Sequence, residues 1–218
     1  NHRGDGTPDW IDRLAGAAAA FVPAGGDPAL TLRDVIVAER DWLLGDGTIE
    51  VFSAVNQMGQ GIATTLAQLV VDAFGVPLDR VRVVLGDTDR GDGFGSAGSR
   101  SIFTGGSAMQ VGSQRTIEHA KTLAAQELEA AADDIGYAAG EFKVKGTDVG
   151  ISLFALAAKQ PEGRIHLEST SSVSGPTWPN GCHVSEVEID PATGEVQVVA
   201  YSSVNDVGRV VNPMIVRG

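Results

Sequence analysis

Two glycine-containing segments hold the residue types in this sequence that could do chemistry. The first is Met58-Gly59-Gln60-Gly61, which precedes a stretch with helical periodicity. A Gly-x-Gly turn that leads into a helix presents unpaired backbone N–H groups, and the helix dipole favours an anion or a polar ring at that end. Gln60 adds a side chain that both donates and accepts hydrogen bonds. The segment is therefore a candidate binding loop, and a tight turn that needs glycine for geometry alone is an equally good interpretation.

The second segment spans residues 93–101 (GFGSAGSRS) and leads toward the longest helical pattern of the chain. Its small residues would let the backbone close on a ligand. Ser99 and Ser101 offer hydroxyl groups, and Arg100 can neutralise a phosphate. We interpret the segment as a second binding loop because it occurs together with the first. Without the first loop, a flexible surface loop would be the better interpretation.

Three common motifs do not fit these loops. The Gly-x-x-x-x-Gly-Lys-Ser/Thr pattern of P-loop nucleotidases is absent. Gly93, Gly95 and Gly98 have Gly-x-Gly-x-x-Gly spacing, but about seven residues separate them from the preceding predicted strand, whereas a dinucleotide fold places the motif directly after a strand. Ser96 cannot be the serine of a nucleophile elbow, because position 94 is Phe rather than Gly.

A dinucleotide-binding unit built on the first loop is the alternative. Gly59 and Gly61 follow a predicted strand and open a helix, and the next strand ends near Asp87, which could reach a ribose. Against this, Thr64 stands where the third glycine is expected. Asp87 also follows Gly61 by 26 positions, whereas the usual spacing is about 20.

The other polar candidates are interpreted as ordinary surface or core residues. Three aspartates lack the spacing of a helix–loop–helix calcium site and fit a solvated turn: Asp87, Asp89 and Asp92. The four histidines show no metal-ligand spacing: His2, His119, His166 and His183. Glu186 and Glu188 share one face of a strand, which is typical of a solvated face. Cys182 fits a small apolar core residue near a strand.

Composition narrows the function classes. The 218 residues, 43% of them hydrophobic and 20% charged, are typical of a globular protein. A formal charge of −12 argues against nucleic acid or an anionic membrane as a partner. No stretch approaches the roughly 18 apolar residues of a membrane-spanning helix. One cysteine excludes an internal disulfide and a multi-cysteine zinc or iron–sulfur site. We expect a cytoplasmic protein; because the first residue is Asn, a missing leader and a periplasmic location stay open.

The hydrophobic periodicity predicts a mixed architecture of helices and strands, with an antiparallel hairpin near the end. Residues 1–30 are predicted to be irregular, and residues 86–106, with seven glycines, to be turn-rich. Gly75 and Gly136 are predicted to end the two longer helices, and Ser152 is predicted to cap a short one. Turns are predicted at Asp46-Gly47 and at residues 190–194. Strands are predicted at 32–38, 49–55, 81–85, 141–144, 164–173, 182–189 and 195–204, and helices at 62–74, 107–135 and 152–159.

The ordered set of motifs from about residue 45 to the end resembles the large subunits of xanthine dehydrogenase/aldehyde oxidase-type molybdenum hydroxylases. The motifs are MGQG at 58–61, GVP at 75–77, GDT at 86–88, AGSRS at 97–101, NG at 180–181, TG at 193–194, DVG at 206–208 and NP at 212–213. The resemblance implies an α+β (mixed α/β) molybdenum-cofactor-binding lobe over residues 45–218, with mixed and antiparallel strands packed against helices. It leaves residues 1–44 as a poorly explained N-terminal segment with a first strand.

The resemblance also implies roles for both loops. Gly59, Gln60 and Gly61 would contact the molybdenum cofactor, with Gln60 near the oxo ligand and the pterin. A second set would hold the pterin and the phosphates, in the cytosine dinucleotide form if the protein is bacterial: Gly98, Ser99, Arg100 and Ser101. The family's general-base glutamate would lie beyond Gly218, so no catalytic residue and no metal ligand is assigned, and the isolated chain is expected to be inactive.

The family's reaction is the oxidative hydroxylation of an aldehyde or an N-heteroaromatic compound with oxygen from water. The implied partners are the remainder of the large subunit or a second molybdenum-subunit chain, and an iron–sulfur subunit. Iron–sulfur clusters, with or without FAD, would sit on partner chains. Two other functions stay open at this point: a NAD- or FAD-binding domain, and a non-catalytic assembly lobe of the same fold.

Overall fold

The computed structural model describes residues 35–90, 95–173 and 177–218, so the predicted irregular segment 1–30 and Asp92 lie outside the described residues. The chain divides into two compact units. The larger contains the described part of Leu32–Gly175 together with Val211–Gly218, and the smaller contains the described part of Pro176–Val210.

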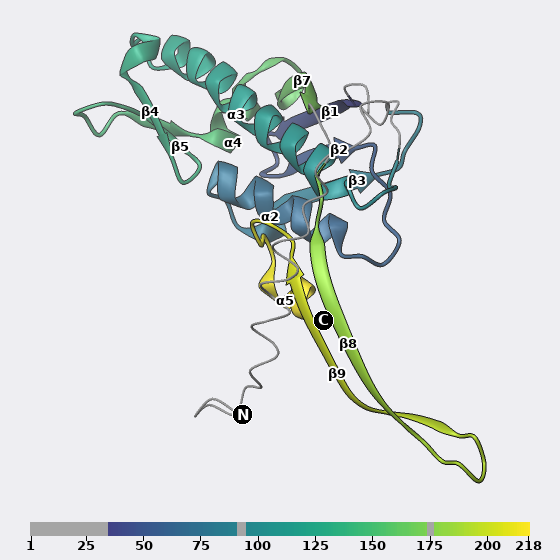
Figure 1. Cartoon of the computed structure of the whole chain (residues 1–218). Helices are drawn as coiled ribbons and strands as arrows, with labels where there is room; N and C mark the ends of the chain where they lie inside the picture. Colours follow the sequence, from purple (N-terminus) through teal and green to yellow (C-terminus); the bar gives the residue numbers. More distant parts are fainter. Residues whose placement is uncertain (1–34, 91–94, 174–176) are drawn as a thin grey trace. The chain divides into compact units, whose positions relative to one another are not determined.

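A four-stranded sheet forms the centre of the larger unit, with the order β3-β2-β1-β7 (Figure 1). Its strands are β1 (Val35–Leu44), β2 (Ile49–Ser53), β3 (Val81–Leu85) and β7 (Arg164–Val173). β1 is antiparallel to both β2 and β7, whereas β2 and β3 are parallel. The sheet is therefore mixed, as the resemblance implied.

The first predicted strand agrees with the structure over residues 35–38 but ends too early. It was expected at residues 32–38, but β1 continues to Leu44 because it pairs along its length with β7 and then turns into β2. The predicted turn at Asp46-Gly47 is confirmed: the Asp46 carboxylate accepts a hydrogen bond from the Thr48 backbone N–H at 2.9 Å.

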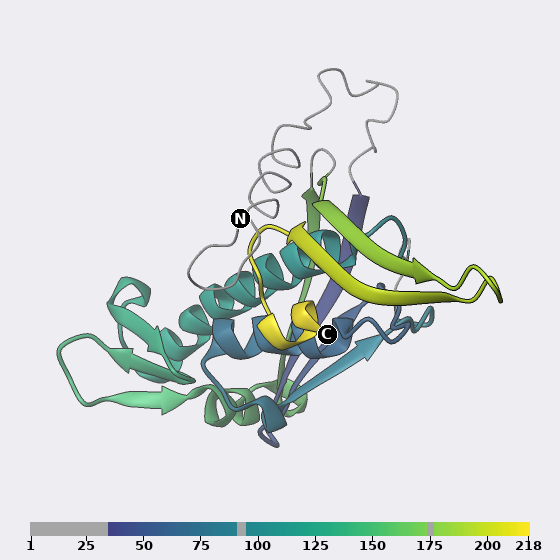
Figure 2. The same ribbon diagram turned by 60° about the horizontal axis from the view of Figure 1, so that its bottom comes forward.

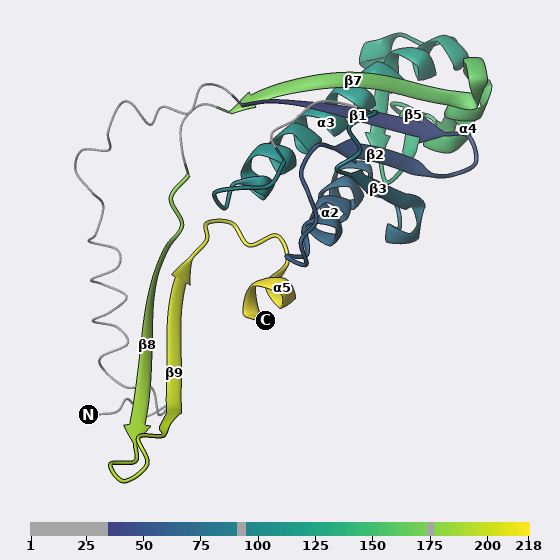
Figure 3. The same ribbon diagram turned by 90° about the vertical axis from the view of Figure 1, so that its right-hand side faces the viewer.

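Two helices, α2 (Ile62–Phe74) and α3 (Ser101–Glu127), lie side by side against one face of this sheet (Figures 2 and 3). The core between helices and sheet is aliphatic and aromatic, and its fully buried side chains include Leu43, Ile49, Val51, Leu66, Val70, Phe74 and Met109. Burial of such side chains contributes about 1.5–3 kcal/mol each. The helices thereby have a rigid support.

α2 spans the predicted residues and ends at the predicted glycine. Gly75 has a left-handed φ of 64°, and its N–H donates to the carbonyl of Val71. The Tyr137 hydroxyl donates to the Phe74 carbonyl at 2.8 Å and so satisfies another carbonyl of the last turn. Burial raises the pKa of the Tyr137 phenol, which keeps it protonated as the donor.

α3 differs from its prediction at both ends. It begins at Ser101 rather than at residue 107, so Gly105 and Gly106 lie inside the helix. A Cβ at Gly105 would lie 3.0 Å from Val55 Cγ1 on the neighbouring segment, so glycine here permits close helix–sheet packing rather than a turn. The helix ends at Glu127, and Gly136 lies within a strand instead of stopping the helix.

A small antiparallel sheet, β4-β5-β6, completes the larger unit with the helix that follows it. α4 (Leu153–Lys159) begins at the predicted serine cap, because the Ser152 hydroxyl accepts a hydrogen bond from the Ala155 N–H at 3.2 Å. The remaining elements of this unit are β4 (Ile135–Ala138), β5 (Glu141–Val144), β6 (Gly150–Ser152), α5 (Pro213–Arg217) and the short 3-10 helices η2 (Leu78–Arg80), η3 (Ala132–Asp134) and η4 (Pro161–Gly163).

The smaller unit is the predicted hairpin, an antiparallel ribbon of β8 (Asn180–Ile189) and β9 (Val196–Asp206). Its tip is the predicted turn: the Asp190 carboxylate accepts a hydrogen bond from the Ala192 N–H at 2.7 Å, which lowers the pKa of Asp190. Among the described helices of the whole chain, none is long and apolar enough to cross a membrane.

Candidate functional site

The two glycine loops leave the sheet at the same edge. β2 and β3 are parallel neighbours, with Ser53 at the end of β2 opposite Leu85 at the end of β3. The chain after β2 leads through residues 54–61 into α2, and the chain after β3 leads through residues 86–100 into α3. The carboxyl edge of parallel strands is the usual place for a ligand in such sheets. The loops thus meet at the edge where binding is expected.

A pair of hydrogen bonds joins the loops directly. The Asn56 backbone N–H donates to the Ser96 hydroxyl oxygen at 2.8 Å, and the same hydroxyl donates to the Asn56 carbonyl at 2.8 Å. The two residues are 40 positions apart in the chain. The Gly86 N–H, at the start of the second loop, donates to the Ser53 carbonyl at 3.3 Å. The loops are therefore held at a defined spacing.

Gln60 folds back onto its own turn. Its side-chain oxygen accepts a hydrogen bond from the Met58 N–H at 2.6 Å, and its side-chain nitrogen donates to the Asn56 carbonyl at 2.8 Å. The Asn56 carbonyl thus accepts from both Gln60 and Ser96. The Gln60 amide is solvent-exposed and retains one N–H and one acceptor lone pair for a further partner.

The glycines beside Gln60 present different surroundings. Gly59 has φ 88°, and no described atom lies within 4 Å of a Cβ built there. At Gly61, with φ 76°, a Cβ would lie 2.8 Å from Ile215 Cδ1 of α5. The backbone of the first loop is therefore open at Gly59 and covered by α5 at Gly61.

The second loop is open at the corresponding place. Gly98 has φ 63°, and no described atom lies within 4 Å of a Cβ built there. Ser99 follows with φ 54°, a left-handed conformation that is uncommon for a residue other than glycine. Gly98 and Ser99 are exposed, and Arg100 and Ser101 are half-buried. The four predicted residues therefore form an accessible turn at the start of α3.

Both loops end at helix N-termini that lack a side-chain cap. The N-cap residues are Gly61 for α2 and Arg100 for α3, and among the described residues no side chain accepts a hydrogen bond in the capping position of either helix. Neither helix carries an acidic residue in its first turn. Such helix ends favour a bound anion, because the first-turn N–H groups and the dipole point toward it.

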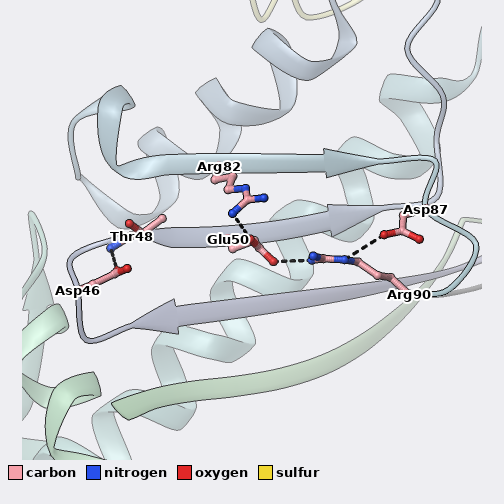
Figure 4. Close-up of polar contacts among 6 residues, drawn as sticks. All are labelled: Asp46, Thr48, Glu50, Arg82, Asp87 and Arg90. Atoms are coloured by element: carbon pink, nitrogen blue, oxygen red, sulfur yellow. Dashed lines mark hydrogen bonds and ion pairs between the residues drawn. The ribbon is translucent and has the colours of Figure 1, made fainter. Parts of the chain in front are cut away.

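A charge network supports the second loop from the sheet (Figure 4). Arg90, in the loop after β3, forms an ion pair with Glu50 of β2 and a second with Asp87 at 3.2 Å. Arg82 of β3 approaches the other oxygen of Glu50 at 3.2 Å. The Glu50 side chain is only 9% exposed, and its hydrogen bond raises the pKa of the Arg90 guanidinium. The loop is thus tied to the strand that precedes the first loop.

Several other polar candidates have partners within their own unit. Asp87, which the dinucleotide alternative assigns to a ribose, is instead paired with Arg90. His183 contacts the Tyr201 hydroxyl at 2.8 Å on the ribbon, where Glu186 and Glu188 are exposed and Cys182 is half-buried. Within the part of the chain that the structure describes, no group of three or more His, Cys, Asp or Glu side chains is placed to hold a metal ion.

Sequence reasoning missed three residues that shape this edge. Asn56 directly follows a buried run that ends at Val55, and Ser96 was considered only as a catalytic serine. Glu50 is a charged residue within an otherwise apolar strand, and a lone acid in such a strand is a usable signal for a buried ion pair. Its partner Arg90 carried no local signal.

Residues 40–218 match the family model of the molybdopterin cofactor-binding domain. The matched range contains both glycine loops and every element from β2 onward. The chain belongs to this family. The resemblance to the molybdenum-binding large subunits of the xanthine dehydrogenase/aldehyde oxidase family is thereby confirmed, as is the predicted fold class.

Two relatives are similar to most of this chain. The nicotine 6-hydroxylase large subunit of Paenarthrobacter nicotinovorans is 35% identical over 79% of the chain, and the carbon monoxide dehydrogenase large chain of Hydrogenophaga pseudoflava is 34% identical over 76%. The chain spans 22% of the length of each.

The crystal structure of quinoline 2-oxidoreductase from Pseudomonas putida 86 superposes with a TM-score of 0.71 at 30% identity. It covers 84% of this chain, which corresponds to 25% of that protein's chain. The dinucleotide-binding alternative is not favoured by these likenesses.

Proposed function

We propose that this chain is the part of a molybdenum hydroxylase large subunit that binds the molybdopterin cofactor. The whole enzyme would catalyse oxidative hydroxylation of an aldehyde or an N-heteroaromatic compound with oxygen derived from water. The observation that carries the proposal is the convergence of two open glycine loops, each leading into a helix without a side-chain cap, within the residues matched by the family model.

The residues at this edge fit the chemistry of the cofactor. A molybdopterin presents a hydrogen-bonding ring system and an anionic phosphate. A Cβ built at Gly59 or Gly98 would have no described atom within 4 Å, so a ring or phosphate can approach the main chain closely at these two positions. The first turns of α2 and α3 carry no acidic residue that would repel an anion.

Each predicted residue has a role that its geometry permits. Gly59, Gln60 and Gly61 would line one side of the cofactor, with Gln60 offering the amide group that its turn leaves available. Ser99 and Ser101 would donate hydroxyl hydrogens to the second side. Arg100, the N-cap residue of α3, would add positive charge beside the phosphates.

The chain's contribution would be positioning and electrostatics, while the bound molybdenum centre would supply the oxidation–reduction chemistry. Neither a catalytic base nor a metal ligand is assigned to these residues. The residues would hold the cofactor in one orientation and present it to groups outside this lobe. Residues 45–218 would form that lobe, and residues 1–44 stay without a proposed role.

The finer features of the enzyme follow as part of the proposal. The names of two relatives, a nicotine hydroxylase and a quinoline oxidoreductase, support an N-heteroaromatic substrate. We further propose the cytosine dinucleotide form of the cofactor and a cytoplasmic complex. Its other parts would be the remainder of the large subunit or a second molybdenum-subunit chain, and a subunit with iron–sulfur clusters, with or without FAD.

Metal and nucleotide analysis of the native complex tests the proposal. The full polypeptide that contains these residues would be purified from its own source with the chains that accompany it. We expect stoichiometric molybdenum and, after acid hydrolysis, cytidine monophosphate. A folded complex that contains neither molybdenum nor pterin would contradict the proposal and leave a non-catalytic lobe of the same fold.

A further inference from the structure

We propose that Ser96 is a positioning residue that sets the spacing of the two cofactor-binding loops, so that retention of the cofactor depends on its hydroxyl group. The inference rests on the proposed function, but its structural part can be tested separately. Ser96 lies outside the turn 98–101 and needs no contact with the cofactor to act in this way.

The Ser96 hydroxyl bridges the loops through both of its hydrogen-bonding capacities. It accepts from the Asn56 N–H and donates to the Asn56 carbonyl, each at 2.8 Å. Two bonds to one residue fix both the distance between the chains and their relative slide, as a pair of bonds does between strands. A single hydrogen bond would still allow one loop to shift along the other.

The same contact is linked to Gln60. The Asn56 carbonyl accepts simultaneously from the Ser96 hydroxyl and from the Gln60 side-chain nitrogen at 2.8 Å. The Gln60 oxygen in turn accepts from the Met58 N–H. A displacement of Ser96 would therefore disturb the hydrogen bonds of the Gln60 side-chain amide, although Ser96 belongs to the second loop and Gln60 to the first.

The side chain of Asn56 restricts the alternatives. A Cβ at Gly86 would lie 3.0 Å from Asn56 Oδ1, and a Cβ at Gly95 would lie 3.2 Å from Asn56 Nδ2. The Asn56 side chain thus lies close to the backbone at two points of the second loop. Because of this packing, the hydrogen bonds between Ser96 and Asn56 can form at only one alignment of the two loops.

The spacing matters because one ligand must touch both loops. The open backbone positions Gly59 and Gly98 sit on different loops, each beside the start of a different helix. Binding groups need to be held within about 0.5 Å of their productive positions to contribute fully. A loop that slides would keep its own contacts with the cofactor and lose those of its partner.

The test compares Ser96→Ala with a matched variant, Thr147→Ala, in the full native complex. The Thr147 hydroxyl also donates to one backbone carbonyl, that of Val144 at 3.0 Å, and accepts from one backbone N–H, that of Val149 at 3.1 Å. It joins residues of a single local turn, so its loss controls for two missing hydrogen bonds. Ser96→Thr keeps the hydroxyl and serves as the conservative rescue.

Two readouts are measured, and they do not require activity. Amide hydrogen exchange is expected to rise in both loops, 54–61 and 95–101, in Ser96→Ala, and only near residue 147 in Thr147→Ala. Release of pterin during dialysis, followed by fluorescence, is expected to be about tenfold faster in Ser96→Ala, which corresponds to the loss of a modest interaction. Ser96→Thr should restore both values.

The outcomes separate this inference from the proposed function. Unchanged exchange in the first loop, or pterin retention in Ser96→Ala equal to that of Thr147→Ala in a pterin-containing complex, would overturn the positioning role. Coupled exchange in protein that never contains pterin would support the bridge between the loops and contradict the proposed function instead. Ser96 is half-buried and Asn56 exposed, so water can replace the lost partners and Ser96→Ala is expected to fold.

Discussion

The helices α2 and α3 begin differently from the short helices α4 and α5 of the same unit. α4 begins at Ser152 and α5 at Asn212, and each of these side chains accepts a hydrogen bond from the N–H three residues on, at 3.2 and 3.0 Å. α2 begins at Gly61 and α3 at Arg100, and among the described residues neither start has a side-chain cap. A side chain therefore caps a first-turn N–H group in α4 and α5, whereas α2 and α3 have no such cap.

The difference separates stability from binding capacity. A side-chain cap stabilises a helix by about 1 kcal/mol and occupies one of the N–H groups that an anion would need. α4 and α5 therefore have closed ends. α2 and α3 give up that stabilisation, and a ligand at their ends can supply the missing partners. The two helices with open ends are the ones that start at the glycine loops.

The largest expected effect comes from filling the open space at Gly98. Gly98→Ala is compared with Gly163→Ala, because both glycines have φ 63° and neither has a described atom within 4 Å of a built Cβ. The backbone strain, about 1–2 kcal/mol, should be the same in both variants. We expect Gly98→Ala alone to lower the affinity for the cofactor, by about a hundredfold or 2.7 kcal/mol. Molybdenum content after dialysis measures the difference, and equal retention in both variants would contradict an open binding edge.

The second effect concerns how the second loop is held. Glu50→Gln removes a carboxylate that is 9% exposed and paired with Arg82 and Arg90. Loss of a fully buried pair costs about 3–5 kcal/mol, and the partial exposure of both arginines reduces this to about 2 kcal/mol. Urea unfolding measures the change. The matched variant Glu118→Gln breaks an exposed pair with Lys121 and should change stability by less than about 0.5 kcal/mol. Similar values for the two variants would show that the network does not support the loop.

The smallest effect tests the capped ends. Ser152→Ala removes the α4 cap and should lower the free energy of unfolding by about 1 kcal/mol. Because α4 does not start at a glycine loop, cofactor content should not change. Thermal unfolding measures the first effect and molybdenum analysis the second. A loss of cofactor in Ser152→Ala would contradict the conclusion that only the uncapped helices, α2 and α3, contribute to cofactor binding.

Local patterns predicted much of the fold. The limits of α2, β3, β5 and β7 agree with the sequence prediction, and so does the serine cap of α4. α3 was predicted to begin too late, because the glycine pair at 105–106 was interpreted as part of a turn. In the structure, Gly105 packs against Val55, and only the neighbouring segment reveals why a small residue is needed there.

The candidate site was predicted in its parts but not in its assembly. The resemblance assigned residues 59–61 and 98–101 to the cofactor, and their placement at one sheet edge supports that assignment. The contributions of Asn56, Ser96 and the Glu50–Arg90 pair did not follow from spacing, because each depends on a partner 40 positions away.

By itself, the sequence determined most of the helices and strands, and the turns at residues 46–47 and 190–194. These features depend on preferences and periodicities that act over a few neighbouring residues. Only the tertiary structure decided that the loops meet, that Ser96 bridges to Asn56, and that α5 covers Gly61 while Gly59 stays open. Those contacts require the parallel pairing of β2 with β3 and the return of the C-terminal helix, and no local preference specifies either.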